Sequence, residues 1–254
     1  HWSGGGCMHY IRFSSLLLVV TLAATGCATV TAQLSESFFA RETAQEIART
    51  DPGSNDNTME SVDPNRDGEP GLSDRQTRIL QAAESMLSTQ SFLVGGYQYS
   101  YDCTGTILAI YAMAGVRLVD LFPNYTGNGV ERLYRIAEER ALLYHTELPQ
   151  PGDLIFWDNT YDKNGDTKWN DWLTHVGLVL ETGADGTIEY VHHDYSRGVV
   201  RARMNLLDPT THLADDGVIV NSPMRMRSHR HLNPDEWLAS HLYRRLGAMH
   251  RIEL

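Results

Sequence analysis

The sequence predicts an α+β protein in which helices come first and an antiparallel sheet follows. Apolar residues recur at helical spacing in three stretches between residues 73 and 137. The apolar run Asp153–Trp157 then signals a buried strand, after a break at Pro149–Gly152. Further strand patterns follow it, and a hairpin turn at Ala184–Gly186 joins two of them. The chain therefore separates its helices from its sheet.

Each element has its own local signal. Ser73 or Asp74 can cap the first helix, and a glycine at Gly115 can end the second one, which starts at Cys103. The third helix opens at Gly127–Gly129. Strands are expected at 175–181, 187–193 and 199–204, an irregular stretch at 206–232, and a last helix from Asn233 to about Leu246.

These signals divide the chain into four parts. We expect a signal segment at 1–27, a flexible tether at 28–72, a folded domain at 73–205, and a C-terminal extension with one helix at 206–254. The tether is rich in Thr, Ser, Asp, Asn and Gly and lacks sustained periodicity. Its end, 63–74, has the ligand spacing of a calcium loop, although a solvated acidic turn is the alternative.

The N-terminal segment has the proportions of a secretory signal that starts at Met8. Its apolar core, Leu16–Val20, is too short to span a bilayer. Small residues precede Cys27, which resembles a bacterial lipobox; a plain signal cut at a small residue is the alternative. We therefore expect acylation at Cys27 and a lipid-anchored protein of the cell envelope, on its periplasmic or outer-surface side.

Charge and cysteine content narrow the class of protein. The formal net charge is −11 and no basic block offsets it, which argues against nucleic acid or an anionic membrane surface as the main partner. Three cysteines do not make a disulfide framework. After removal of the signal and acylation of Cys27, Cys103 is expected to be the only free thiol.

Cys103 stands at the expected N-terminus of an apolar helix. Unpaired N–H groups and the helix macrodipole favour a negative charge there, and such a position can lower the pKa of a thiol from roughly 8.5 to about 3.5–7.5. A small buried hydrophobic residue is the alternative for Cys103. Cysteine catalysis also needs a base and a group that orients the base. His175 begins one expected strand and His192 lies on the next, across a tight turn, so His192 is expected to hydrogen-bond the ring of His175.

Four short motifs carry a family resemblance. Asp-Cys-Thr-Gly at 102–105, Pro-Gly-Asp-Leu-Ile-Phe at 151–156, His-Val-Gly at 175–177 and Tyr-Val-His at 190–192 resemble the motifs of the NlpC/p60 peptidases. These are papain-like cysteine hydrolases that cut bacterial cell-wall peptides. The resemblance covers roughly residues 75–205. It implies a papain-like NlpC/p60 fold, with the cysteine helix packed on an antiparallel meander.

The resemblance also implies a function and its residues. Cys103, His175 and His192 would be catalytic, and the substrate would be a peptidoglycan stem peptide, cut beside D-glutamate. Asp102 would meet a substrate amine, and we expect Thr104 and Tyr101 to face the substrate with it. No cofactor is expected, and the protein is expected to be a monomer.

The sequence departs from the family pattern at three places. Phe92 stands where the family usually has a tyrosine that helps to bind the oxyanion; Tyr97, Tyr99, Tyr101 or the Cys103 backbone N–H are the substitutes. Thr104 replaces the usual serine. The acidic insertion 158–171 is longer than the usual connection, and a surface loop, a substrate-shaping loop and a metal loop remain open for it.

Other readings remain open. CHAP-type amidases share the order of cysteine and histidine, a catalytically silent wall-binding scaffold would keep the fold, and lipid acyl transfer is the least favoured. His193 competes with His192 for the third catalytic place, although strand alternation points it to the other face. Zinc at Cys103, His175 and His192 is not expected, because closely spaced ligand pairs are lacking.

Overall fold

A computed structural model describes residues 71–87, 89 and 91–254 of the chain. The expected signal, the lipidation site Cys27 and nearly all of the tether lie outside the described residues, as does most of the loop 63–74. In the part that is described, no helix is long and apolar enough to cross a membrane.

The helices begin where local capping signals place them. Ser73 caps α1 (Asp74–Met86) through a reciprocal capping box with Gln76, and the helix buries one apolar face. α2 spans Cys103–Met113, so the predicted start at Cys103 is confirmed. Gly115 follows it with φ +86°, a conformation that ends a helix at little cost only in glycine. Asn128 caps α3 (Gly129–Glu139) in the same way as Ser73 caps α1.

Shorter elements connect these helices. A small hairpin, β1 (Leu93–Val94) with β2 (Tyr97–Gln98), lies between α1 and α2. The 3-10 helix η1 (Leu118–Asn124) joins α2 to α3.

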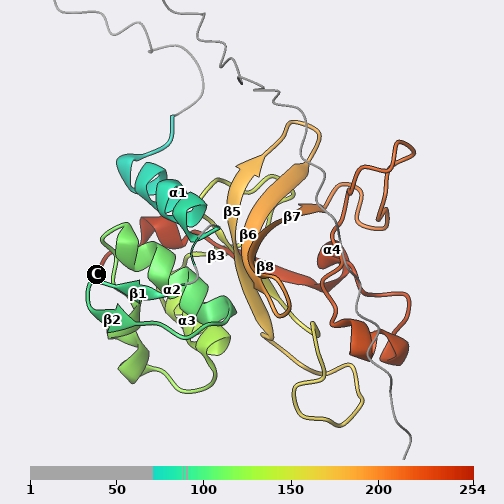
Figure 1. Cartoon of the computed structure of the whole chain (residues 1–254), viewed down its shortest axis with the longest axis horizontal. Helices are drawn as coiled ribbons and strands as arrows, with labels where there is room; N and C mark the ends of the chain where they lie inside the picture. Colours follow the sequence, from blue (N-terminus) through green and yellow to red (C-terminus); the bar gives the residue numbers. More distant parts are fainter. Residues whose placement is uncertain (1–70, 88, 90) are drawn as a thin grey trace, which may run out of the picture. The chain divides into compact units, whose positions relative to one another are not determined.

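The sheet has six strands in the order β3-β8-β4-β5-β6-β7, and every neighbouring pair is antiparallel. The strands expected from the alternation are all present. The six strands are β3 (Leu143–Tyr144), β4 (Leu154–Trp157), β5 (His175–Thr182), β6 (Thr187–Asp194), β7 (Gly198–Asn205) and β8 (Tyr243–Gly247). The α+β class is therefore confirmed, and Figure 1 shows the helices beside the sheet.

The predicted last helix, from Asn233 to about Leu246, is wrong. The structure holds only the short helix α4 (Ala239–Leu242) there, and the chain then enters β8. The slot between β3 and β4 gives β8 hydrogen-bonding partners on both edges, and this tertiary pairing outweighs the local helical spacing. Two 3-10 turns, η2 (Arg227–Leu232) and η3 (Met249–Arg251), flank this region.

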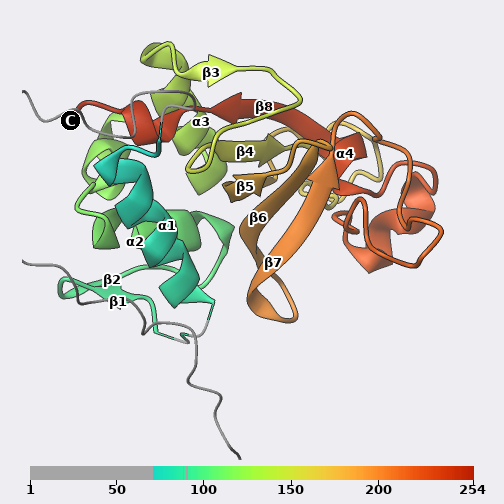
Figure 2. The same ribbon diagram turned by 90° about the horizontal axis from the view of Figure 1, so that it is seen from above.

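The sheet carries a separate hydrophobic core on each face. Leu154, Phe156 and Val176 point to one face and pack with the helices, in what we call the helical core. Ile155, Trp157 and residues from the C-terminal segment form the second core on the other face. Figure 2 shows α1 and α2 on one side of the sheet and α4 on the other. This alternation decides which side chains reach the candidate site from each face.

Candidate active site

The motif Asp-Cys-Thr-Gly positions Cys103 at the first residue of α2. Asp102 is the N-cap, and its carboxylate accepts a hydrogen bond of 2.7 Å from the backbone N–H of Gly105. A Cβ on Gly105 would lie 1.9 Å from the carbonyl oxygen of Ser100, so only glycine fits against that backbone. The cap and the close approach together fix where the thiol stands.

The surroundings of Cys103 oppose ionisation of the thiol. Burial first, and the negative charge of Asp102 second, raise the pKa of Cys103 to about 11. The backbone N–H groups of Val176 and Thr104 and the Thr104 side chain lie near the sulphur and lower the pKa, but by less. The expected low pKa is therefore wrong, because burial and the capping carboxylate outweigh the helix N-terminus. At neutral pH the group is a thiol.

His175 and His192 form the hydrogen bond that the sequence predicts. Nε2 of His175 lies 2.9 Å from Nδ1 of His192, and Gly177 pairs with His192 in the register of β5 and β6. This bond occupies Nε2 of His175 and leaves its Nδ1 for another partner. Val176, whose N–H contacts the Cys103 sulphur, directly follows His175 in the chain. The structure therefore joins the two histidines and brings the start of β5 to the thiol.

Both histidines are neutral at pH 7. Burial, followed by the neighbouring His192, holds the pKa of His175 well below its ordinary value. Burial also lowers the pKa of His192 to about 4, although Asp194 partly opposes the shift. A neutral imidazole can accept a proton, so His175 is in its basic form while the thiol of Cys103 is protonated.

Close packing explains why a glycine occupies the third position of the motif His-Val-Gly. A Cβ on Gly177 would lie 3.0 Å from the ring of Trp157, which is fully buried. The Trp157 ring centroid is 5.8 Å from that of His175, and the indole N–H donates to the carbonyl of Ala239 over 2.8 Å. The missing side chain at Gly177 thus lets Trp157 lie against His175 and limit its orientations.

His193 points to the other face of the sheet, as the alternation predicts. Its ring meets that of Tyr101 edge-on at 4.5 Å and that of Phe92 at 6.2 Å. Burial lowers the pKa of His193, and the nearby Asp102 charge opposes this. His193 thus belongs to the helical side, and the partner of His175 is His192.

The tyrosines before Cys103 do not gather around the thiol. Phe92 is 1% exposed and packs on Tyr101, so it is a core residue. Burial raises the pKa of Tyr99, and its charged neighbours are Arg117 and Asp120, on the side of η1. The hydroxyl of Tyr101 lies at Gly198, where a Cβ would be 2.7 Å away.

Asp102 and Thr104 line a groove of about 370 Å³ beside the cysteine. Thr104 packs directly on Gly129 at the start of α3, since a Cβ there would lie 2.4 Å from its methyl group. The remaining lining residues are Tyr97, Gln98, Tyr99, Ser100, Leu108, Val119 and Phe122. Two of the three residues expected to face substrate therefore share one groove, while Tyr101 is not among its lining residues.

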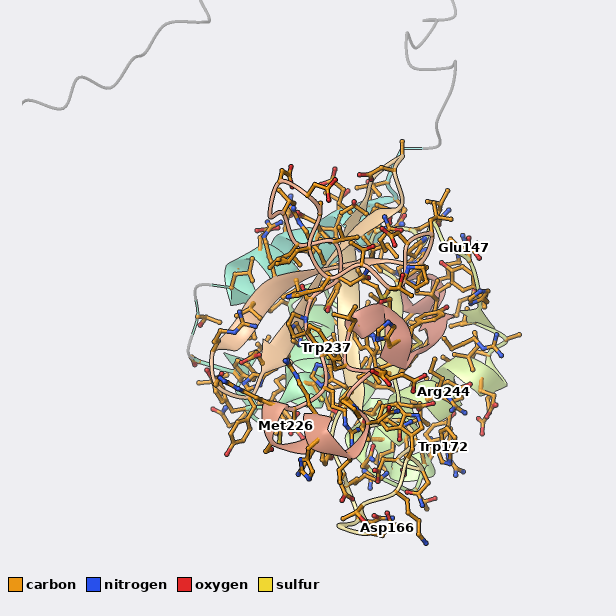
Figure 3. The ribbon with its side chains drawn as sticks, turned by 90° about the vertical axis from the view of Figure 1, so that its right-hand side faces the viewer. Glu147, Asp166, Trp172, Met226, Trp237 and Arg244 are labelled. Atoms are coloured by element: carbon orange, nitrogen blue, oxygen red, sulfur yellow. The ribbon has the colours of Figure 1, made fainter. Side chains whose placement is uncertain are left out.

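The insertion 158–171 is a tied loop. Carboxylates of Asp162 and Asp166 accept hydrogen bonds from backbone N–H groups within the loop. Nowhere among the described residues do three or more His, Cys, Asp or Glu side chains gather as a metal site. Figure 3 shows Asp166 at the outer end of this loop, and Trp172 and Arg244 nearer the body of the protein.

Sequence reasoning missed two residues of this region. Tyr161, inside the insertion, is half-buried, and Cys103 is among the groups that raise its pKa, after burial itself. Arg225 is 1% exposed, and its guanidinium donates to the carbonyl oxygens of Asn159 and His229. A lone tyrosine in an acidic loop and a lone arginine in an irregular stretch give no periodic or motif signal.

Comparison with known proteins gives a structural likeness only. No family profile matches the chain, and no curated protein matches it. Among solved structures, the chain is similar to a crystal structure described as similar to lipoprotein, NLP/P60 family, from Staphylococcus aureus subsp. aureus Mu50, with 20% identity and a TM-score of 0.31. The match covers 52% of this chain and 37% of that chain. The matched protein is of the family that the motifs resemble, and the inferences below rest on the motifs and the geometry of this chain.

Proposed function

We propose that the protein is a cysteine peptidase that cleaves peptidoglycan stem peptides. The observation that carries this proposal is the arrangement at the start of β5. There the thiol at a helix N-terminus meets the backbone N–H of Val176, next to the hydrogen-bonded pair His175–His192. The four motifs that resemble the NlpC/p60 peptidases are the segments that build this arrangement.

The first half of the reaction forms an acyl-enzyme. Because the thiol and both imidazoles are neutral, His175 takes the thiol proton as the sulphur attacks the carbonyl carbon. The S–C bond forms and the carbonyl π electrons move to oxygen. His192 holds the ring of His175 through their hydrogen bond. The C–N bond then breaks, and His175 gives its proton to the leaving amine.

The second half releases the acyl group. Water attacks the thioester carbonyl while His175 accepts a proton from the water. The C–S bond breaks, the carboxylic acid leaves, and the proton returns from His175 to sulphur. The thiol of Cys103 and the imidazole of His175 have then regained their starting protonation states.

The groove beside the site suits a peptide with a cationic end. One Asp102 oxygen caps α2, and the carboxylate lines the groove with Thr104. We place the substrate amine at this carboxylate, as the family resemblance implies. The aromatic residues of the groove provide apolar surface for the peptide stem.

The cellular setting belongs to the same proposal. Acylation of Cys27 would anchor the protein in the cell envelope, on its periplasmic or outer-surface side. The protein would act as a monomer without a cofactor, and nucleic acid would not be a partner.

Digestion of purified peptidoglycan by the 254-residue chain tests the proposal. We expect new stem-peptide ends by mass spectrometry, no cleavage by Cys103→Ala, and a strong loss in His175→Ala. A matched control is Met113→Ala, at an exposed position at the far end of the same helix. Release of whole stem peptides from the glycan would instead identify an amidase of the CHAP type. Absence of any cleavage by the folded chain would overturn the hydrolase proposal.

A silent wall-binding scaffold is the second candidate. The raised pKa of Cys103 and the phenylalanine at Phe92 favour it. A scaffold would bind peptidoglycan in a sedimentation assay without cutting it, and Cys103→Ala would bind equally well. Cleavage that depends on Cys103 would exclude this candidate.

A further inference from the structure

Tyr161 lies in the insertion 158–171 and has no part in the mechanism above. Its neighbours in the chain are tied to the two sides of the candidate site. Thr160, directly before it, is buried and its backbone N–H and hydroxyl both lie 2.9 Å from the hydroxyl of Thr174. Thr174 directly precedes His175, so one side of Tyr161 is fixed to the strand that carries the base.

The other side of Tyr161 is fixed to the helices. Lys163 forms an ion pair of 2.9 Å with Glu131, in the first turn of α3. Gly129, in that same turn, packs on Thr104, the residue after Cys103. The segment 160–163 therefore runs from the His175 side of the site to the Cys103 side, and Tyr161 lies between these two attachments.

Arg225 and His229, from the C-terminal part of the chain, also hold the segment that contains Tyr161. The side chain of Arg225 donates to the carbonyl oxygen of Asn159, and its guanidinium lies 4.5 Å from the centre of the Trp169 ring. His229 accepts a hydrogen bond of 3.2 Å from the backbone N–H of Asp162. Contacts on both sides of Tyr161 therefore fix the chain at this position before substrate arrives, and a group that acts on a transition state requires such a fixed attachment.

Tyr97 and Tyr99 line the groove with Asp102, but the contacts of the tyrosines before Cys103 are with groups other than the thiol. The Tyr101 hydroxyl lies at Gly198, and Tyr99 is buried towards Arg117 and Asp120. Tyr97 packs its ring on Tyr99, with centroids 4.7 Å apart. Tyr161 differs, because burial raises its pKa and the charge of Cys103 is the next largest cause. Its hydroxyl therefore keeps its proton at neutral pH and can donate.

We propose that the Tyr161 hydroxyl donates a hydrogen bond to the substrate carbonyl oxygen while the Cys103 sulphur attacks the carbonyl carbon. The inference rests on the proposed peptidase function. As the S–C bond forms, the oxygen gains negative charge, and the hydroxyl stabilises that charge without giving up its proton. The thiol proton still goes to His175. The insertion thus supplies a donor that Phe92 lacks.

The test compares Tyr161→Phe with Tyr125→Phe in the 254-residue chain. The Tyr125 hydroxyl bonds Glu139 and Arg140, so the control also removes a phenol hydroxyl that has partners. With a stem peptide as substrate, we expect kcat of Tyr161→Phe to fall about 10²-fold with little change in KM. Tyr125→Phe should retain the wild-type kcat.

A second measurement separates a catalytic from a structural role. A stem-peptide aldehyde adds the Cys103 thiol to its carbonyl and places an oxygen where the oxyanion forms, whereas the matching alcohol does not. Tyr161→Phe should weaken the aldehyde about tenfold or more and leave the alcohol unchanged. Because the ratio of the two affinities is taken within one protein, partial unfolding does not alter it.

Each outcome decides a different claim. Reduced kcat together with a reduced aldehyde-to-alcohol ratio supports the inference. A wild-type kcat and ratio in Tyr161→Phe would overturn the inference and leave the peptidase standing. A wild-type protein that neither cleaves the peptide nor binds the aldehyde at Cys103 would overturn the proposed function, and the role of Tyr161 with it.

Discussion

The two faces of the sheet contribute differently to the candidate site. The helical core holds Cys103, which packs against an apolar cluster built from regular helices. The second core holds the pair His175–His192 beside Trp157, under a C-terminal segment with little regular structure. Cys103 therefore lies on one face and the histidine pair on the other, and the sulphur of Cys103 lies near Val176, where β5 begins.

The two faces are also stabilised by different means. Apolar area dominates the helical side, whereas buried polar groups fix the irregular segment on the other side. Asn221 is fully buried, and its side chain accepts from the N–H of Asn205 and donates to the carbonyls of Asp208 and Thr211. Such groups specify one arrangement because an unmade bond there costs about 1–3 kcal/mol. The irregular segment is thus held by specific polar contacts, whereas the helices are held by apolar packing.

Removing Trp157 is expected to have the largest effect, and it breaks the second core alone. Trp157→Ala should lower the free energy of unfolding by about 3–5 kcal/mol, because it leaves a cavity and an unpaired Ala239 carbonyl. Trp172→Ala is the control, at a side chain that is 55% exposed, and should cost less than about 1 kcal/mol. Urea unfolding measures both. Equal losses of unfolding free energy in the two variants would show that Trp157 stabilises the fold no more than an exposed tryptophan does.

Acid should weaken the second face through its histidines. The pKa of His192 is about 4 in the folded protein and about 6.5 when unfolded, so the unfolded chain binds more protons between these values. Stability is therefore fully present above about pH 6.5 and falls by roughly 3 kcal/mol as the pH drops to about 4. His175, with its lowered pKa, acts in the same direction.

Unfolding in urea at several pH values measures this fall. His192→Gln keeps an amide donor for His175 but does not titrate, and its stability should fall less steeply with acid. Parallel curves for the two proteins would show that His192 is not the group that titrates.

On the helical face, the raised pKa of Cys103 should slow alkylation of the thiol. With a pKa of about 11, the thiol should react with iodoacetamide at pH 7 roughly 20-fold more slowly than an exposed cysteine, and its rate should keep rising above pH 9. Asp102→Asn keeps an N-cap but removes the charge that raises this pKa, so alkylation should accelerate. Peptide mass mapping follows Cys103 separately from Cys7 and Cys27. A rate that levels off below pH 8 would contradict the raised pKa.

The smallest expected effect concerns the edge of the helical face. Ser73→Ala removes the capping box of α1 and should cost about 1 kcal/mol in unfolding free energy. Ser73→Asp restores a cap and should return most of that stability. Loss of the Cys103 reaction in Ser73→Ala would show that α1 supports the site more directly than the packing indicates.

The sequence predicted the helical side and the strands β4 to β7 well, because local signals there agree with the tertiary fold. Ser73, Gly115 and Gly177 each do locally what their position requires. The hydrogen bond between His175 and His192 was predicted from their positions on neighbouring antiparallel strands, in whose register His192 pairs with Gly177. The prediction of a helix over residues 233–246 was wrong. Leu238, Leu242 and Leu246 have helical spacing, yet Leu246 lies in β8.

The rest of the site depended on contacts between segments far apart in the chain. The pKa of Cys103 follows from burial beneath several elements, which no single motif encodes. The chain on either side of Tyr161 is fixed by bonds from Thr160 to Thr174 and from Lys163 to Glu131, and no local pattern predicts these contacts. The catalytic roles of Cys103, His175 and His192, and the substrate roles of Asp102, Thr104 and Tyr101, stay predictions.

The position of β8 has a consequence for how the chain folds. β8 lies between β3 and β4, and its residue Gly247 pairs with both Leu143 and Leu154. During folding, β3 and one edge of β4 therefore stay unpaired until residues 243–247 join them. Contacts between such distant residues form slowly, and unpaired strand edges recruit other chains. A chain cut before Tyr243 would thus expose these strand edges and should aggregate more readily than the chain that contains β8.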